Sequence, residues 1–195
     1  MTQTTVTIRD ATVADAPGIA RVWMQSWRST YPGLIPASVL VNLSEAATVR
    51  RWRTVIETQG PGIGTIVAVD RSGRLSPDRQ PDGIVGVASF GAHRTAMDRY
   101  AGEIHTLYLL DDAKGLGIGR RMMASIADRL LADAVQSAAL WCLADNPACW
   151  FYERMGGIRV AERPIRFVGS DLREVAYGWR DLVPLARLST GPQVR

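Results

Sequence analysis

The chain has few of the residues and segments that mark metal sites, disulfide frameworks and membrane spans. Only two cysteines, Cys142 and Cys149, and two histidines, His93 and His105, occur among its 195 residues. Their spacing fits neither a CxxC motif nor a zinc site, so we expect two reduced thiols and no metal. No apolar run approaches the ~20 residues of a membrane helix. The N-terminus also lacks the regions of a signal peptide, so we expect a cytoplasmic protein with no membrane partner.

Long runs of basic residues are also missing. The net charge is +4 and the isoelectric point is near 9.5, but the only short cluster is Arg50-Arg51-Trp52-Arg53. Nucleic-acid binding would need a basic stripe with stacking aromatic residues, so we expect no nucleic-acid partner. We assign the cluster to the solvated face of a helix. The mildly positive field does suit an anionic small ligand.

What is present is the composition of an ordinary globular domain, with 47% hydrophobic and 22% charged residues and no internal repeat. We expect one domain over residues 1–183 and a flexible tail over residues 184–195. Periodicity predicts helices ending near residues 27, 59, 131 and 155, and strands at 6–9, 63–69, 84–90, 103–110, 138–143, 158–162 and 174–179. This order predicts a mixed α/β sheet with helices on both faces. Loops are expected at 70–83 and 164–171.

The most informative segment is Glu103–Gly119, EIHTLYLLDDAKGLGIG. A strand-like run is followed by a loop with glycine at Gly115, Gly117 and Gly119, and then by a predicted helix. The first turn of a helix has unpaired N–H groups and carries roughly half a positive charge. Glycines let the backbone approach an anion closely. The segment therefore predicts a ligand that contains phosphate.

Three phosphate ligands compete for this loop. The string GxxxxGK[ST] of nucleoside triphosphatases is absent. The dinucleotide fingerprint GxGxxG needs its third glycine at position 120, where the chain has Arg120. That fingerprint also needs an acidic residue about 20 positions on, but Asp133 falls in the predicted helix and Asp145 in a loop. Coenzyme A is the third ligand, and it requires a further motif.

Two motifs resemble the GNAT family (Gcn5-related N-acetyltransferases). Residues Lys114–Gly119 resemble the acetyl-CoA signature Q/R-x-x-G-x-G/A, with Lys114 in place of Gln or Arg. Residues Asn146–Gly156 resemble the N-x-x-A-x-x-F-Y-x-x-x-G pattern, with Cys149 in place of its alanine. The similarity extends over about residues 6–182. It implies a single-domain GNAT-like fold with a mixed, mostly antiparallel sheet of about six to seven strands.

The resemblance also implies where the acyl donor, acetyl-CoA, would bind. In the family it enters between two splayed strands, here 103–110 and 138–143, and its pantetheine arm pairs with an open strand edge. The implied cofactor-binding residues are Leu107, Leu109, Lys114, Gly115, Leu116, Gly117, Ile118, Gly119, Arg120 and Asn146, with Arg121 as an alternative to Arg120. Asn146 before Pro147 is equally typical of a helix N-cap.

Three residues are candidates for catalysis. The family uses the tyrosine of its F-Y pair, here Tyr152, to stabilise or protonate the departing CoA thiolate. An amine must also lose a proton before it attacks, and Glu103 or His105 could accept it. The two are separated by one residue on a strand and so share a face. Glu103 occupies a position that acts as base in some relatives, whereas His105 has the better intrinsic pKa. Each of the three could instead have only a structural role.

The acceptor is expected to be a small-molecule amine or a peptide N-terminus. Trp27 and Tyr31, with the turn 32–36, resemble one wall of the family's acceptor pocket, and the 164–171 loop is expected to form the other. Neither carries an acidic cluster for a polycation. The leading hypothesis is acetyl transfer by direct attack in a ternary complex. A CoA-binding regulatory domain without activity is the alternative. O-acetyl transfer, a longer acyl donor and a homodimer remain open.

Overall fold

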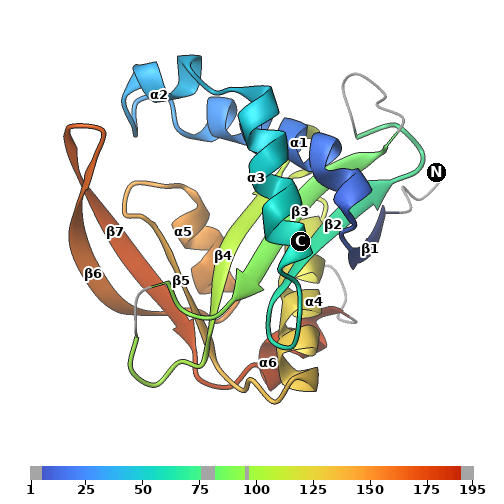
Figure 1. The fold of residues 1–195 in the computed structure, drawn as a ribbon. Helices are drawn as coiled ribbons and strands as arrows, with labels where there is room; N and C mark the ends of the chain where they lie inside the picture. The colour runs from blue at the N-terminus through green and yellow to red at the C-terminus, as the bar shows by residue number, and fades with distance from the viewer. Residues whose placement is uncertain (1–5, 76–81, 95–96, 190–195) are drawn as a thin grey trace.

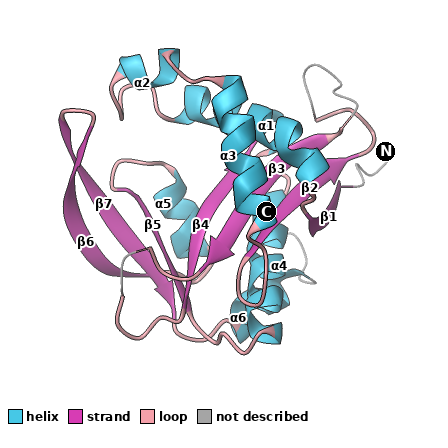
Figure 2. Ribbon diagram, viewed as in Figure 1, coloured by secondary structure: helices cyan, strands magenta, loops and turns pink. Residues whose placement is uncertain are grey.

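A computed structural model describes residues 6–75, 82–94 and 97–189 of the chain (Figure 1). Seven strands form one sheet in the order β1-β2-β3-β4-β5-β7-β6 (Figure 2). All neighbours are antiparallel except β4 and β5, which are parallel. The predicted mixed, mostly antiparallel sheet is therefore confirmed. The strands are β1 (Val6–Asp10), β2 (Gly64–Asp70), β3 (Ile84–Gly91), β4 (Gly102–Leu109), β5 (Ala138–Leu143), β6 (Ile158–Phe167) and β7 (Ser170–Trp179).

Helices cover both faces of this sheet. Helix α1 packs on β3 and β4 and against α3, whereas α4 packs on β1, β2 and β4 and against α6. The helices are α1 (Ala16–Thr30), α2 (Ala37–Val41), α3 (Glu45–Glu57), α4 (Ile118–Ala132), α5 (Ala148–Arg154) and α6 (Val183–Ala186). Among the described residues, none of these helices is long and apolar enough to cross a membrane.

The hydrophobic core lies between the sheet and the two helical layers. Ile19 and Val22 of α1 and Met122 and Ile126 of α4 are completely buried, as expected from their helical spacing. Every residue of β3 is buried because helices cover both of its faces. Burying a side chain of this size contributes about 1.5–3 kcal/mol. The central strands are therefore a rigid base for whatever lies at their ends.

Two irregularities in β4 create space next to this rigid base. Strands β4 and β5 pair only at Gly102–Ala138 and Glu103–Ala139 and separate beyond that point. On the other edge of β4, Ser89 lies opposite Thr106 while Phe90 lies opposite Ile104. His105 is thus the extra residue of a β-bulge, a feature that re-aims side chains.

The structure differs from the sequence-based expectation at three places. The 164–171 segment is not a loop, because β6 and β7 continue through it and turn only at Val168 and Gly169. Pro164 is tolerated since β6 is the edge strand, where a missing N–H costs no ladder bond. The connector after residue 36 contains the short helix α2. The tail is ordered at its start, where α6 buries Leu185, and residues 190–195 lie outside the described part.

Candidate active site

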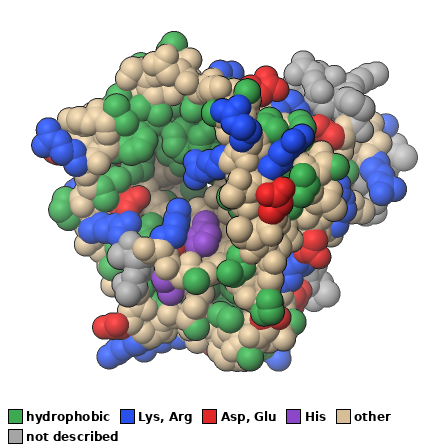
Figure 3. Space-filling view, viewed as in Figure 1, with side chains coloured by type: hydrophobic (Ala, Val, Ile, Leu, Met, Phe, Trp, Pro, Cys, Tyr) green, Lys and Arg blue, Asp and Glu red, His purple; other side chains and the backbone are tan. Residues whose placement is uncertain are grey.

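A cavity of about 1140 Å³ extends along the opening between β4 and β5. Leu107 and Leu109 line it from β4, and Trp141 and Cys142 line it from β5. The molecule is hollowed here, with hydrophobic side chains along the upper wall and Lys, Arg and His side chains at the rim (Figure 3). The Leu109 carbonyl already accepts a hydrogen bond from Ser26 Oγ at 3.0 Å. The remaining edge of β4 is open to a ligand that can extend the sheet.

The glycine loop forms one end of the same cavity. Gly115 and Gly117 have φ of 73° and 75°, a left-handed conformation that favours glycine, and Gly117 is the N-cap of α4. A Cβ on Gly119 would lie 3.3 Å from Phe151 Cζ, so a glycine here lets α5 pack closely. The loop residues that line the cavity are Lys114, Gly115, Gly117, Gly119 and Arg120. Leu116 and Ile118 were predicted with them but are not among its lining residues; Leu116 is 46% exposed and Ile118 is buried.

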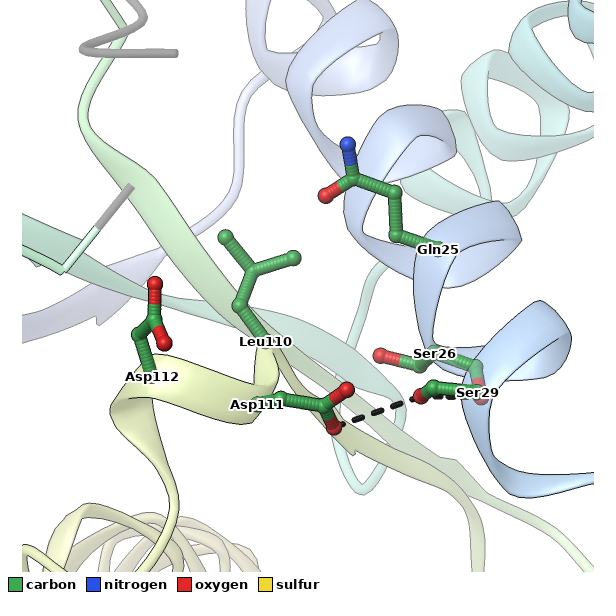
Figure 4. A pocket seen from close by; sticks show the side chains of 6 residues that line it. All are labelled: Gln25, Ser26, Ser29, Leu110, Asp111 and Asp112. Carbon is green, nitrogen blue, oxygen red and sulfur yellow. Dashed lines mark hydrogen bonds between the residues drawn. The ribbon is translucent and has the colours of Figure 1, made fainter. Parts of the chain in front are cut away.

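The cations next to this loop have different orientations. Lys114 Nζ lies 2.5 Å from Asp111 Oδ1, and the same oxygen accepts a hydrogen bond from Ser29 Oγ at 3.2 Å. Ser29 and Asp111 border a second hollow of about 310 Å³ between α1 and the end of β4 (Figure 4). Arg120 lines the large cavity, whereas Arg121 donates to the Val6 carbonyl at 2.8 Å. Arg120 is therefore the cation of the pair that can reach a ligand.

Asn146 stands at the start of α5 and lines the cavity. Its Oδ1 accepts a hydrogen bond from the Ala148 amide at 2.9 Å, so the side chain satisfies a donor of the first turn. The N-cap itself is Pro147, one residue later than predicted. The side chain is buried. Contact with CoA stays a prediction for this residue.

Tyr152 projects from α5 into the cavity, and its ring is 7% exposed. Burial raises the pKa of its hydroxyl, and the neighbouring Cys142 and Tyr108 raise it further. The hydroxyl therefore keeps its proton at any physiological pH and can only donate a hydrogen bond to an anion. The catalytic role of Tyr152 stays a prediction, and it requires this protonated form.

The two cysteines lie at the wall of the cavity as free thiols, and Cys142 lines it. Their sulfur atoms are 3.5 Å apart, because Cys149 occupies the first turn of α5 opposite β5. Burial raises the pKa of the Cys142 thiol. The thiol stays protonated and is a poor nucleophile.

Glu103 is buried at the beginning of β4, and donors from one neighbouring residue occupy its carboxylate. The backbone amide and the side-chain Nε of Arg94 donate hydrogen bonds to this carboxylate at 2.9 and 2.8 Å. The terminal nitrogen Nη2 of Arg94 lies 2.5 Å from the carboxylate oxygen Oε1. His93 Nδ1 is 3.5 Å from the second carboxylate oxygen. Glu103 is not among the residues that line the cavity. The carboxylate is thus committed to holding the β3–β4 connection.

His105 lines the cavity, and one of its two ring nitrogens can accept a proton. Its Nε2 lies 2.9 Å from the Ala92 carbonyl, which can only accept, so Nε2 carries the hydrogen and Nδ1 has the lone pair. Burial lowers the pKa of His105 below its ordinary value of 6.5, which leaves the ring neutral at pH 7. The bulge interrupts the regular alternation assumed for Glu103 and His105, yet both lie within electrostatic range of Arg94.

A row of aromatic rings on α1 reaches the cavity at its last member, Tyr31. The rings of Trp23 and Trp27 are 4.3 Å apart, and those of Trp27 and Tyr31 are 5.0 Å apart. The hydroxyls of Tyr31 and Tyr108 are 3.0 Å apart. Tyr31 lines the cavity as predicted, whereas Trp27 is not among its lining residues and supports Tyr31 from behind.

Sequence reasoning missed Tyr108 among the residues that line the cavity, and His93 and Arg94 beside Glu103. Tyr108 could have been found, since it lies between the two predicted cofactor positions on β4. His93 and Arg94 come from a loop whose path no local pattern fixes. No group of three or more possible metal ligands occurs within the described ranges.

A family model and a curated protein both match this chain in sequence. The family model described as FR47-like protein matches residues 83–165. The uncharacterized N-acetyltransferase YuaI of Bacillus subtilis (strain 168) is 34% identical over 183 residues, which are 94% of this chain and 98% of that protein.

Two solved structures share the fold. A GNAT superfamily phosphinothricin acetyltransferase of Sinorhizobium meliloti in complex with AcCoA has a TM-score of 0.62 at 21% identity, over 90% of this chain and 88% of that one. A ribosomal-protein-alanine N-acetyltransferase of Brucella melitensis has a TM-score of 0.65 at 20% identity, over 89% and 98%. At these identities, the two structures bear on the fold alone.

Proposed function

The chain belongs to the GNAT family of N-acetyltransferases, and we propose that it transfers acetyl from acetyl-CoA to a primary amine by direct attack in a ternary complex. One observation carries this proposal. The glycine loop, the open edge of β4 and the Tyr152 hydroxyl all face a single cavity. A ligand that needs an anion site at one end, a strand edge along its length and a proton donor at the other would fit it.

Acetyl-CoA has these three requirements. Its pyrophosphate would lie on the amides from Lys114 to Gly119, where α4 begins, with Arg120 beside it. Its pantetheine arm would pair with the backbone of Leu107 and Leu109, where β5 has separated from β4. The thioester would then lie near Tyr152, and a bound acetyl-CoA in a fold relative supports this donor.

The transfer has two parts. His105 Nδ1 accepts a proton from the ammonium group of the acceptor, directly or through a water molecule. The amine nitrogen then forms a bond to the carbonyl carbon and gives up its second proton to water, while the carbon–sulfur bond breaks, so that CoA leaves as a thiolate. The Tyr152 hydroxyl donates a hydrogen bond to this sulfur. A thiol has a pKa of about 8.5 and a phenol about 10, so the phenol is the weaker acid. We therefore expect Tyr152 to stabilise the thiolate by a hydrogen bond and not to transfer its proton completely.

Glu103 and Cys142 take no part in the chemical step of this proposal. The geometry favours His105 over Glu103 as base, since the Glu103 carboxylate is occupied by Arg94. Glu103 would act as a positioning residue for the β3–β4 connection. No acyl-enzyme on cysteine is needed, because burial keeps the Cys142 thiol protonated.

Calorimetric titration with acetyl-CoA tests the proposal, with NADH and ATP as controls. We expect acetyl-CoA to bind and Arg120→Glu to weaken it strongly, whereas Arg121→Glu, whose side chain is directed to Val6, has a small effect. Release of free CoA is then measured over a panel of amines. If acetyl-CoA does not bind, the cavity is not a cofactor site. Binding without transfer to any amine would favour the regulatory domain.

A further inference from the structure

The two cysteines of the chain form a pair to which the proposed acetyl transfer gives no role. Cys142 lies on β5 and Cys149 in the first turn of α5, and their sulfur atoms face each other at 3.5 Å. A disulfide bond is about 2.05 Å long, so the two sulfur atoms would have to approach by about 1.5 Å to form one. A small shift of the short helix α5 toward β5 would supply this approach.

The cysteine pair can be reached from the cavity. Cys142 is among the residues that line it, and both cysteines are partly exposed. The cavity, at about 1140 Å³, has room for a small reagent that contains sulfur. Such a reagent would meet Cys142 first, with the sulfur of Cys149 in contact behind it.

The groups around Cys142 keep it in the thiol form at neutral pH. Burial is the main cause of its raised pKa, Cys149 and Glu174 of β7 act in the same direction, and Arg159 of β6 acts against them. The hydroxyl of Tyr152, on α5, is neutral as well. Because only a thiolate attacks a disulfide, a first attack by Cys142 is slow at neutral pH and becomes faster as the pH rises. A second attack, by Cys149, is intramolecular and needs no further encounter.

From these contacts we propose that Cys142 and Cys149 are a reversible oxidation site for low-molecular-weight disulfides, and that the bond between them slows the acetyl transfer. The Cys142 thiolate attacks one sulfur of the small disulfide, and a first small thiolate leaves. Cys149 then attacks the Cys142 sulfur of the mixed disulfide, and the second small thiolate leaves. Each cysteine loses one proton and each leaving thiolate gains one. The dithiol is thereby oxidised by two electrons, and the small disulfide is reduced by two.

The bond would act on the reaction through Tyr152. This residue is three positions after Cys149 on α5, and both cysteines act to raise the pKa of its hydroxyl, so they lie close to it. A shift of α5 toward β5 would displace the hydroxyl from the sulfur of the acyl donor. A misplacement of about 1 Å can lower a rate about 100-fold. This consequence rests on the proposed acetyl transfer, whereas formation of the disulfide does not.

Intact mass spectrometry after incubation with glutathione disulfide at mildly alkaline pH tests whether the bond forms. We expect the loss of two hydrogen atoms, with no glutathione attached and no dimer, and dithiothreitol should restore the starting mass. Cys149→Ser should instead stop with one glutathione on Cys142, because the second thiol is missing. The chain has no other cysteine, so the mass alone identifies each product.

Turnover is measured on the same samples. The kcat of the oxidised wild-type protein should be roughly tenfold or more below that of the reduced protein and should return with dithiothreitol. In the double variant Cys142→Ser/Cys149→Ser, glutathione disulfide should leave kcat at its value without the reagent.

The proposal is overturned if the wild-type protein binds two glutathiones, forms disulfide-linked dimers, or keeps both thiols although they react fully in urea. A disulfide that forms and leaves kcat unchanged overturns its effect on the transfer. Failure of the proposed function itself looks different, since no form of the protein would then release CoA while the loss of two hydrogen atoms would still be observed.

Discussion

Replacing Tyr152 by phenylalanine removes one oxygen atom from the centre of the proposed reaction. The ring is buried, it stacks edge-on against Phe151 at 5.4 Å, and Phe at this position keeps these contacts. No hydrogen bond to the Tyr152 hydroxyl occurs among the described residues, so the substitution breaks none in the empty protein. We expect the free energy of unfolding to change by less than about 0.5 kcal/mol.

The expected loss is in turnover. A hydrogen bond to a charged group contributes about 1.5–3 kcal/mol, and each 1.36 kcal/mol on the barrier changes a rate about tenfold. We therefore expect kcat to fall roughly 10- to 150-fold, while the Kd of acetyl-CoA changes less than about threefold. Steady-state release of CoA gives kcat, and calorimetry gives the Kd. The raised pKa of Tyr152 also means that its hydroxyl should cause no limb in the pH profile of the wild-type protein below pH 10.

Tyr177 provides a matched control for the same chemical change. Its ring centre is 6.0 Å from that of Tyr152, but its hydroxyl donates to Glu153 Oε1 at 2.7 Å and it is not among the residues that line the cavity. Tyr177→Phe should lower stability by about 1 kcal/mol and leave kcat within about twofold. A Tyr152→Phe protein with unchanged kcat, or a Tyr177→Phe protein with an equal loss, would refute the reasoning.

Three further predictions concern neighbouring parts of the site. Since His105 must be neutral to act as base and burial lowers its pKa, kcat/KM should fall only as the pH drops below 6.5, and His105→Asn should remove this limb from the pH–rate profile. Gly117→Ala places a Cβ on a residue with φ of 75°. It should lower the free energy of unfolding, measured by urea denaturation, by about 1–2 kcal/mol, and weaken the binding of acetyl-CoA in calorimetry. Wild-type values in both measurements would contradict the loop geometry. Glu103→Gln should destabilise the fold by about 1–3 kcal/mol in the same assay. We expect a value in the lower part of this range, because the Arg94 side chain is 57% exposed and can be hydrated once the ion pair is lost. An unchanged stability would mean that the ion pair is not formed in solution.

The site could be predicted from sequence where local chemistry fixes it. The glycine loop requires a left-handed backbone and a helix start, and both are encoded within six residues. Tyr152 follows from a motif within one short helix. The partners of Glu103 could not be predicted, because Arg94 reaches the carboxylate from a loop whose path depends on the β-bulge at His105.

The fold shows the same division. Strand β5 was predicted to the residue, since AALWCL is a short apolar run between turn residues. The outer half of the β6–β7 hairpin was predicted as a loop, because Pro164 and Arg166 interrupt the apolar pattern and only pairing with β7 makes the segment a strand. Edge strands gain order from their neighbour more than from their own sequence.

The separation of β4 from β5 divides the seven-stranded sheet into two parts with a narrow connection. Strands β1 to β4 form one part, and β5, β7 and β6 form the other. Among the described residues, the strand pairs that join the two parts are Gly102–Ala138 and Glu103–Ala139. A donor that binds as an extra strand would complete the ladder between them, so its binding free energy would also become stability of the whole fold. At a concentration 100 times its Kd, this amounts to about 2.7 kcal/mol. Hydrogen–deuterium exchange that proceeds through complete unfolding should then slow in every strand, β1 and β2 included. Degradation of the protein in a cell would follow the supply of its own acyl donor.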